Sequence, residues 1–179
     1  MGDGARFRQQ VLPHLDAAYN LARWLLRDPH AAEDAVQEAC VRALKYFAGF
    51  RGEAARPWFL TIVRRCCLDW IADHCREAQF DDGLDAAPDA FGREPPGPEQ
   101  SALDGERTRS LAAALAALPA PYREVVVLRE LEELSYKEIA RVADIPVGTV
   151  MSRLARARAL LQRSPLLEAV REPAAGGGR

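Results

Sequence analysis

Apolar residues recur at spacings of three and four along two long stretches of the chain, which is the period of an amphipathic α-helix. The first stretch runs from Ala5 to Gln79 and fits three or four helices. We expect helices from about Phe7 to Leu26, from Pro29 to about Phe47 with Asp28 as its N-cap, and from near Pro57 onwards. The pattern therefore predicts a compact helical bundle in the N-terminal half.

The expected second helix has one apolar and one polar face. Its apolar face consists of residues at helical spacing, namely Ala32, Val36, Cys40, Ala43 and Phe47. Its polar face carries acidic, amide and basic groups, namely Glu33, Asp34, Gln37, Glu38 and Arg42. We expect the apolar face to be buried, which leaves the polar face for solvent or a partner protein.

The second periodic stretch begins with expected helices from Thr108 to Leu118 and from Tyr122 to about Leu131. Ser135 and Glu138 then form a capping box, in which each side chain bonds the other residue's amide and fixes a helix start. Asp144 tolerates the left-handed backbone of a tight turn, and a proline after it suits the first turn of a further helix. The segment from Leu134 to Leu161 therefore predicts a helix-turn-helix.

The last helix of this unit has a surface suited to DNA. Its inward stripe is expected to contain Val147, Val150, Leu154, Ala157 and Leu161. Small, hydroxyl and basic residues face outward, namely Gly148, Thr149, Met151, Ser152, Arg153, Ala155 and Arg156. These residue types allow close approach to bases and phosphates in the major groove. An ordinary helical hairpin with solvated arginines is the alternative that spacing alone leaves open.

Residues 81–107 separate the two stretches and have a different composition. They contain four prolines, four glycines, eight acidic residues and two arginines, a net charge of -6, whereas the total of -2 leaves +4 for the remainder. This segment is expected to be a flexible linker, which would reach about 90 Å if fully extended. We predict an all-α protein with modules at 1–80 and 108–165 and a disordered tail at 166–179.

The remaining composition excludes several classes of protein. No stretch approaches the roughly 18 apolar residues of a membrane span, so we expect a cytoplasmic protein without membrane insertion. Cys40, Cys66, Cys67 and Cys75 lack the paired spacing of a zinc site and are expected to be reduced thiols. No residues form a catalytic set, and no glycine-rich loop cradles a phosphate. We therefore expect no metal, no cofactor and no enzymatic activity.

Three motifs resemble extracytoplasmic-function sigma factors of the sigma-70 family. The sequence PVGTVMSRLARAR, within Leu118 to Leu161, resembles region 4 of that family. The sequences AAEDAVQEACVRAL, from Ala31 to Leu44, and RPWFLTIVRRCCLDW, from Arg56 to Trp70, resemble region 2. The two matches stand in the family's order on either side of the linker. The resemblance implies a factor that binds RNA polymerase core through its β and β′ subunits and directs it to promoter DNA.

The resemblance also implies roles for individual residues. Asp34, Gln37 and Glu38 match positions that meet the coiled coil of the largest polymerase subunit, as acidic and amide groups at an interface rim would. The positions expected to contact the -10 element are Phe50, Arg51, Gly52, Arg64, Arg65 and Asp69. Residues 50–55 match a loop that receives a flipped base, whereas Trp58 and Trp70 are expected to be core residues.

The residues that match contacts to the -35 element are Gly148, Thr149, Met151, Ser152, Arg153 and Arg156. The chain departs from the family pattern at Arg65, where asparagine is usual, at Met151, where lysine or arginine is frequent, and at Ala155, where a larger residue is frequent. The promoter sequence therefore does not carry over from relatives. An anti-sigma protein that clamps the two modules together is a further implied partner.

Three other functions stay open at this point. A transcription regulator would use the helix-turn-helix alone, with the N-terminal bundle as a sensing or dimerising domain. A metal or redox sensor would use the thiols with His74, although Cys66 and Cys67 are adjacent and diverge around a helix. A helical adaptor would bind only proteins and would not need the basic last helix.

Overall fold

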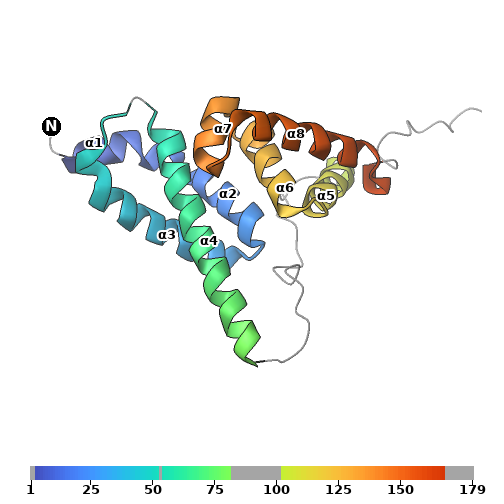
Figure 1. The fold of residues 1–179 in the computed structure, drawn as a ribbon, viewed down its shortest axis with the longest axis horizontal. Helices are drawn as coiled ribbons and strands as arrows, with labels where there is room; N and C mark the ends of the chain where they lie inside the picture. Colours follow the sequence, from blue (N-terminus) through green and yellow to red (C-terminus); the bar gives the residue numbers. More distant parts are fainter. Residues whose placement is uncertain (1–2, 53, 82–101, 168–179) are drawn as a thin grey trace, which may run out of the picture.

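The structure is a computed structural model that describes the backbone of residues 3–52, 54–81 and 102–167, and the side chains of 3–52, 54–75 and 108–167. Every regular element in these ranges is helical, which confirms the predicted all-α class. Two groups of helices lie side by side (Figure 1), one from each periodic stretch. Most of the predicted linker and tail lies outside the described residues.

The N-terminal module contains four α-helices and two short 3₁₀ turns. Its elements are α1 (Asp3–Gln10), η1 (Leu12–His14), α2 (Leu15–Leu26), α3 (Pro29–Tyr46), η2 (Phe47–Gly49) and α4 (Ala55–Asp81). The sequence predicted one helix from Phe7 to Leu26, but the chain forms α1, a 3₁₀ turn and α2 there. Pro13 lies in that turn, where its missing N–H removes an α-helical hydrogen bond.

The junction between α2 and α3 follows the predicted capping. Arg27 ends α2 with a left-handed φ of 58°, and its amide donates to the carbonyl of Arg23. The Asp28 carboxylate then accepts from the amide of Ala31 at 2.9 Å, so it caps α3 as expected. The two helices consequently reverse direction within two residues and pack against each other and against α4.

The core of this module is built from the predicted apolar faces. Phe47, Phe59, Leu21 and Leu60 are fully buried, and α3 turns its polar face to solvent. Trp58 and Trp70 are half-buried rather than enclosed in the core. The bundle therefore positions α3 and α4 with one side of each helix available to partners.

The C-terminal module consists of α5 (Ala102–Ala116), α6 (Ala120–Val126), the π-helical turn η3 (Val127–Leu131), α7 (Tyr136–Ala143) and α8 (Val147–Gln162). Helix α5 begins before residue 108, where the sequence placed the start of this module, so the last residues of the predicted linker are helical. Helices α6, α7 and α8 pack against one another around Val125, Ile139 and Leu154.

The helix-turn-helix forms at the predicted residues. The Ser135 amide donates to Glu138 Oε2 at 2.8 Å, and the Glu138 amide donates to Ser135 Oγ at 3.3 Å, which is the predicted capping box. Asp144 takes the left-handed conformation with φ of 53°. Pro146 occupies the N-cap of α8 rather than its first turn, and Val147 is 39% exposed rather than inward. Helix α8 therefore starts one residue later than expected.

The two modules dock against each other. Helix α7 packs on α4, while α6 and η3 pack on α2, and the buried residues of both modules form one continuous cluster. Figure 1 shows α7 beside the first half of α4, with α8 running away from the N-terminal module. The face of α4 that meets α7 is therefore covered, whereas α8 keeps an open side.

Candidate nucleic-acid interface

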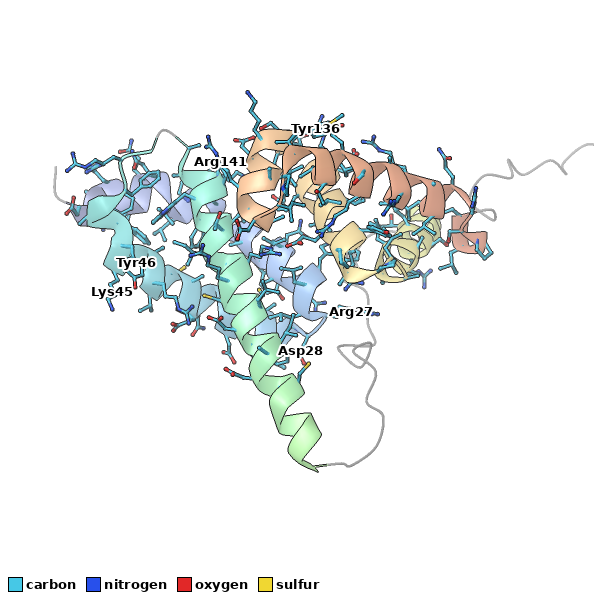
Figure 2. The ribbon with its side chains drawn as sticks, in the orientation of Figure 1. Arg27, Asp28, Lys45, Tyr46, Tyr136 and Arg141 are labelled. Carbon is cyan, nitrogen blue, oxygen red and sulfur yellow. The ribbon has the colours of Figure 1, made fainter. Side chains whose placement is uncertain are left out.

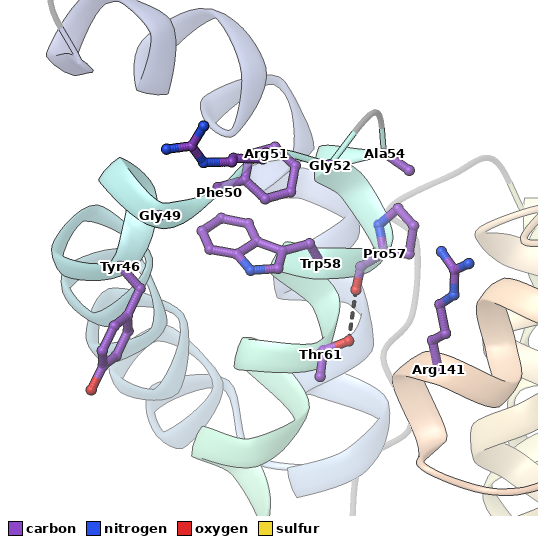
Figure 3. A pocket seen from close by; sticks show the side chains of 10 residues that line it. All are labelled: Tyr46, Gly49, Phe50, Arg51, Gly52, Ala54, Pro57, Trp58, Thr61 and Arg141. Atoms are coloured by element: carbon purple, nitrogen blue, oxygen red, sulfur yellow. Dashed lines mark hydrogen bonds between the residues drawn. The ribbon is translucent and has the colours of Figure 1, made fainter.

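A pocket of about 610 Å³ lies where the α3–α4 connection meets the C-terminal module. Its lining comes from the end of α3, the α3–α4 connection, α4 and α7, and contains Tyr46, Gly49, Phe50, Arg51, Gly52, Ala54, Pro57, Trp58, Thr61 and Arg141 (Figure 3). Arg141 reaches it from α7, on the side opposite Tyr46 (Figures 2 and 3). The pocket thus contains three of the residues expected to meet the -10 element, Phe50, Arg51 and Gly52.

Aromatic rings form the inner wall of this pocket. The rings of Phe50 and Trp58 lie 4.6 Å apart between centroids, and Phe50 also stacks on Phe47 at 5.9 Å. The buried Phe47 is held in turn by an edge contact with Phe7 at 5.3 Å. Such an arrangement presents flat apolar surface beside the exposed Arg51, which suits an unstacked base and its phosphate.

Gly52 lies close against the ring of Phe50. A Cβ atom at position 52 would lie 2.9 Å from Phe50 Cε2, closer than ordinary van der Waals contact. The loop therefore passes directly over the aromatic wall, and a side chain at 52 would displace the ring.

The three predicted DNA-contacting residues of α4 have different surroundings. Arg65 is exposed. Asp69 is also exposed and pairs with Arg42 of α3 at 2.8 Å, while Arg42 pairs with Glu38 at 2.7 Å. These two ion pairs raise the pKa of Arg42. Arg64 instead points into the interface between the two modules, and only 17% of its side chain is exposed.

Two carboxylates of the C-terminal module hold the N-terminal module at this interface. Glu124 of α6 binds Arg64 through both oxygens, the longer contact being 3.4 Å. Glu132, directly after η3, accepts from Arg56 at 2.5 Å and from Asn20 at 2.5 Å. The side chains of Glu124 and Glu132 are only 6% and 5% exposed. Each buried carboxylate is therefore paired and hydrogen-bonded, as burial of charge requires.

Arg123 joins the modules in a different way. Its Nε donates to the carbonyl of Trp24 in α2 at 3.1 Å, and its Nη1 donates to the carbonyls of Ala116 and Leu118 at 3.0 Å each. Trp24 and Ala116 lie in the last turns of α2 and α5, where carbonyls lack helical partners, and Leu118 follows α5. Arg123 consequently ties two helix ends to the start of α6.

The start of α8 forms an exposed surface of the C-terminal module. Of the residues predicted to meet the -35 element, Gly148, Met151, Ser152 and Arg156 are exposed, and Thr149 and Arg153 are half-buried. Ser152 Oγ donates to the carbonyl of Thr149 at 3.0 Å. Among the other arginines of α8, Arg158 pairs with Glu130 at 2.9 Å. The predicted surface is therefore brought together on one helix.

The outer face of α3 carries Asp34, Gln37 and Glu38, all exposed as expected. The same side also exposes apolar groups, with Val41 65% and Leu44 54% exposed. Exposed aliphatic side chains within a charged rim are typical of protein–protein contact surfaces. Sequence periodicity alone gave no role to Val41 and Leu44, although two apolar residues in the polar half of a helix were a readable signal.

The cysteines show the chemistry of structural thiols in the described part of the chain. Cys66 and Cys67 are buried, and burial raises the pKa of Cys67 to about 12. Burial also raises the pKa of Cys40 and of Cys66. No group of metal-ligating side chains is found among the residues with described side chains. No described helix is both long and apolar enough to cross a membrane.

The docked interface was absent from the sequence-based expectations. Arg56, Asn20, Glu124 and Glu132 had been given no role, and Arg64 had been expected to face DNA. The sequence did hold one signal of it: the adjacent charged residues Arg123 and Glu124 directly precede three valines. Charged residues beside an apolar run are buried only when they have partners, so their position indicates buried pairing.

Comparisons with known proteins agree with this geometry. Residues 11–77 match the sigma-70 region 2 family, and residues 108–161 match sigma-70 region 4. The chain is 34% identical over 155 residues to the ECF RNA polymerase sigma factor SigE of Mycolicibacterium smegmatis, covering 85% of this chain and 58% of that protein. It is 31% identical to the RNA polymerase sigma-H factor of Pseudomonas aeruginosa, covering 93% of this chain and 90% of the relative.

A solved structure gives the same fold. The sigma factor RpoE of Bartonella quintana, in complex with the anti-sigma factor NepR, superimposes with a TM-score of 0.77 at 29% identity, covering 93% of this chain and 99% of that one. Both modules match in the same order, which the regulator, sensor and adaptor alternatives do not explain. The chain therefore belongs to the extracytoplasmic-function RNA polymerase sigma factors of the sigma-70 family, which direct promoter-specific transcription initiation.

Proposed function

We propose that this chain binds RNA polymerase core through α3, opens the -10 element with the α3–α4 loop and α4, and holds the -35 duplex with the start of α8. The observation that carries the proposal is the aromatic pocket of Phe50 and Trp58 beside Arg51. A pocket of this kind favours an unstacked base over a paired one, which is what strand opening requires.

The pocket supplies both parts of single-strand recognition. The Phe50 ring offers a face for a base, and the exposed Arg51 offers charge to the backbone next to it. Arg65 and Asp69 extend the same surface along α4. Arg65 is a long cation where the family usually has asparagine, so its contribution is to phosphate attraction and it need not preserve the family's base preference.

Helix α8 is suited to the duplex upstream. Its first turns expose a glycine, a hydroxyl and an arginine, Gly148, Ser152 and Arg156, which allow close approach and hydrogen bonding in a major groove. Met151 is 54% exposed and supplies apolar contact where many relatives carry a cation. A thymine methyl group is the base feature that such a side chain fits.

The face of α3 is the proposed contact with the polymerase core. Asp34, Gln37 and Glu38 provide charge for basic partner residues, and Val41 and Leu44 provide apolar area that becomes buried on binding. All five side chains are exposed in the docked chain, so this side of α3 is open to a partner.

We also propose an anti-sigma protein as a partner, since the B. quintana relative was solved with one. Such a protein would cover exposed faces of α3 and α8. A chain that is equally active when purified and in extract of its source cells, and that carries no co-purifying protein, would contradict this part.

The proposed function is tested by binding measurements with three components. Purified core polymerase with this chain is expected to retain a labelled promoter fragment under heparin challenge, whereas the chain alone and the core alone are expected to release it. A regulator that used only its helix-turn-helix would instead retain duplex DNA without core. Retention by the chain alone, unchanged on adding core, would therefore exclude the proposal.

A further inference from the structure

Arg56 and Arg64 of α4 face the C-terminal module, each held by one of its buried carboxylates. Arg64 meets both oxygens of Glu124, and Arg56 meets Glu132 at 2.5 Å. The arginine side chains are 17% and 33% exposed, against 6% and 5% for their carboxylate partners. The docked interface therefore withdraws two cations of α4 from solvent.

These two cations flank the pocket residues of α4 in sequence. Arg64 precedes Arg65 on the helix proposed to follow the -10 strand, and Arg56 precedes Pro57, a wall of the aromatic pocket. Eight residues of α-helix separate the two arginines, a distance of about 12 Å along the axis. Arg56 thus comes just before the pocket residues of α4, and Arg64 follows one turn after the last of them, Thr61.

A carboxylate and a phosphate diester present similar pairs of oxygens to a guanidinium group, and arginine binds both through two parallel hydrogen bonds. Building on the proposed function, we propose that Arg56 and Arg64 bind phosphates of the opened -10 strand, and that Glu124 and Glu132 occupy the same guanidinium groups in the docked chain. The C-terminal module then competes with the promoter strand for α4.

Other contacts support this competition. Arg141 of α7 lines the pocket of Phe50, so docking also narrows the site for the base. The recognition surface of α8, in contrast, stays exposed in the docked chain. Docking is therefore selective: it engages Arg56 and Arg64 and leaves Arg51, Arg65 and the proposed duplex site exposed.

The ion pairs that hold the two modules together are ones that a polyanion such as a DNA strand can replace. Burying an ion pair costs hydration of both charges, which offsets much of the attraction between them, and separation returns that hydration. A ligand that binds only the separated state shifts the equilibrium by its difference in affinity for the two states. A strand that supplies phosphates to both arginines binds the separated modules alone.

The test uses the full chain without polymerase and a fluorescently labelled single-stranded DNA of mixed sequence. The double variant Glu124→Gln/Glu132→Gln weakens docking, and Glu33→Gln/Glu133→Gln is the control, because it makes the same change in charge at exposed positions outside the docked contacts. The dissociation constant of the first variant for this DNA is expected to be at least about 10-fold lower than that of the wild type. The dissociation constant of the control is expected to stay within about threefold of the wild-type value.

A second variant guards against misfolding and against a pure charge effect. Asn20→Ala removes a hydrogen bond to Glu132 without changing any charge, and is expected to tighten DNA binding in the same direction. Small-angle X-ray scattering should show a larger radius of gyration for Glu124→Gln/Glu132→Gln and for Asn20→Ala, the two opened variants, than for the wild type. The control should keep the radius of gyration of the wild type. Opened variants that expand but bind the DNA no more tightly than the control would overturn the competition.

The role of Arg56 has its own readout. When Arg56→Ala is added to the Glu124→Gln/Glu132→Gln variant, the slope of log affinity against log salt concentration is expected to fall by about 0.7. This is the value for one phosphate contact on a single strand. An unchanged slope would overturn the assignment of Arg56. These outcomes are distinct from failure of the proposed function, in which wild-type chain with core would give no promoter-specific transcripts.

Discussion

Arg42 of α3 binds Asp69 of α4 at 2.8 Å while it also holds Glu38 of its own helix at 2.7 Å. One guanidinium group therefore joins the proposed polymerase-binding face to the helix proposed to follow the -10 strand. All three side chains are exposed enough to exchange partners, so the bridge is a surface link and not part of the core.

Replacing Arg42 with alanine should lower the free energy of unfolding by about 0.5–1 kcal/mol, because exposed ion pairs contribute little individually. Urea denaturation followed by circular dichroism measures this. Lys45→Ala, at an exposed position of the same helix, serves as the control and should cost less. A loss above about 3 kcal/mol would mean that Arg42 has a buried structural role instead.

The capping box gives a prediction on stability and on pH. Ser135→Ala should cost about 1 kcal/mol, since it removes a side-chain acceptor from the first turn of α7. Hydrogen bonds from the Ser135 hydroxyl and amide lower the pKa of Glu138 from its ordinary 4.5. The folded pKa is below the unfolded one, so this stabilisation is complete above pH 4.5 and is lost as the pH falls through the folded pKa.

Urea midpoints of the wild type and Glu138→Ala, compared across this acidic range, measure the effect. The difference between the two should shrink on acidification. Lys137→Ala, an exposed neighbour outside the box, should show no such convergence. A difference that stayed constant to the most acid point would contradict the assigned role of the Glu138 carboxylate.

These local features were predictable from the sequence because their causes are local. A cap, a left-handed turn residue and an apolar period each act within a few residues, and Asp28, Ser135 and Asp144 all behave as their residue types predict. The sequence also indicated the exposed faces of α3 and α8. At Pro13 a 3₁₀ turn divides the predicted first helix, and at Pro146 the last helix begins one residue later than predicted. The apolar period does not resolve helix boundaries this finely.

The docked interface could not be predicted in the same way. Arg64 pairs with a residue 60 positions later, and Asn20 with one 112 positions later. In sequence, Glu132 has the same appearance as a solvated acid on a helix, and the place of Glu124 before three valines indicates burial but does not identify its partner. Only the packing of the two modules brings each carboxylate to its arginine. Long-range pairing of charges depends on how two modules meet, which neither module's own period encodes.

The proposed duplex contact predicts a salt effect at Arg156. With core polymerase bound to a promoter fragment, Arg156→Ala should weaken binding and reduce the slope of log affinity against log salt by about 1. Arg158→Ala is the matched control, since Arg158 is engaged with Glu130 on another side of α8. Equal slopes for both variants would argue against the assigned surface of α8.

The proposed polymerase contact predicts an effect of the α3 face. The double variant Asp34→Asn/Glu38→Gln should weaken binding to core at least about 10-fold, because it removes two charges from an interface rim. Glu33→Gln, exposed on the same helix but outside the proposed set, should have a much smaller effect. Fluorescence anisotropy of a labelled chain titrated with core measures both. Loss of binding by the control alone would place the contact elsewhere.

The central claim is that this chain gives RNA polymerase core its choice of promoter. Sequencing the 5′ ends of RNA made in vitro by purified core plus this chain, on fragmented DNA from the source genome, measures that choice at both elements together. We predict discrete start sites, absent with core alone, that share two upstream elements at a fixed spacing. The same scattered start sites with and without the chain would contradict the claim.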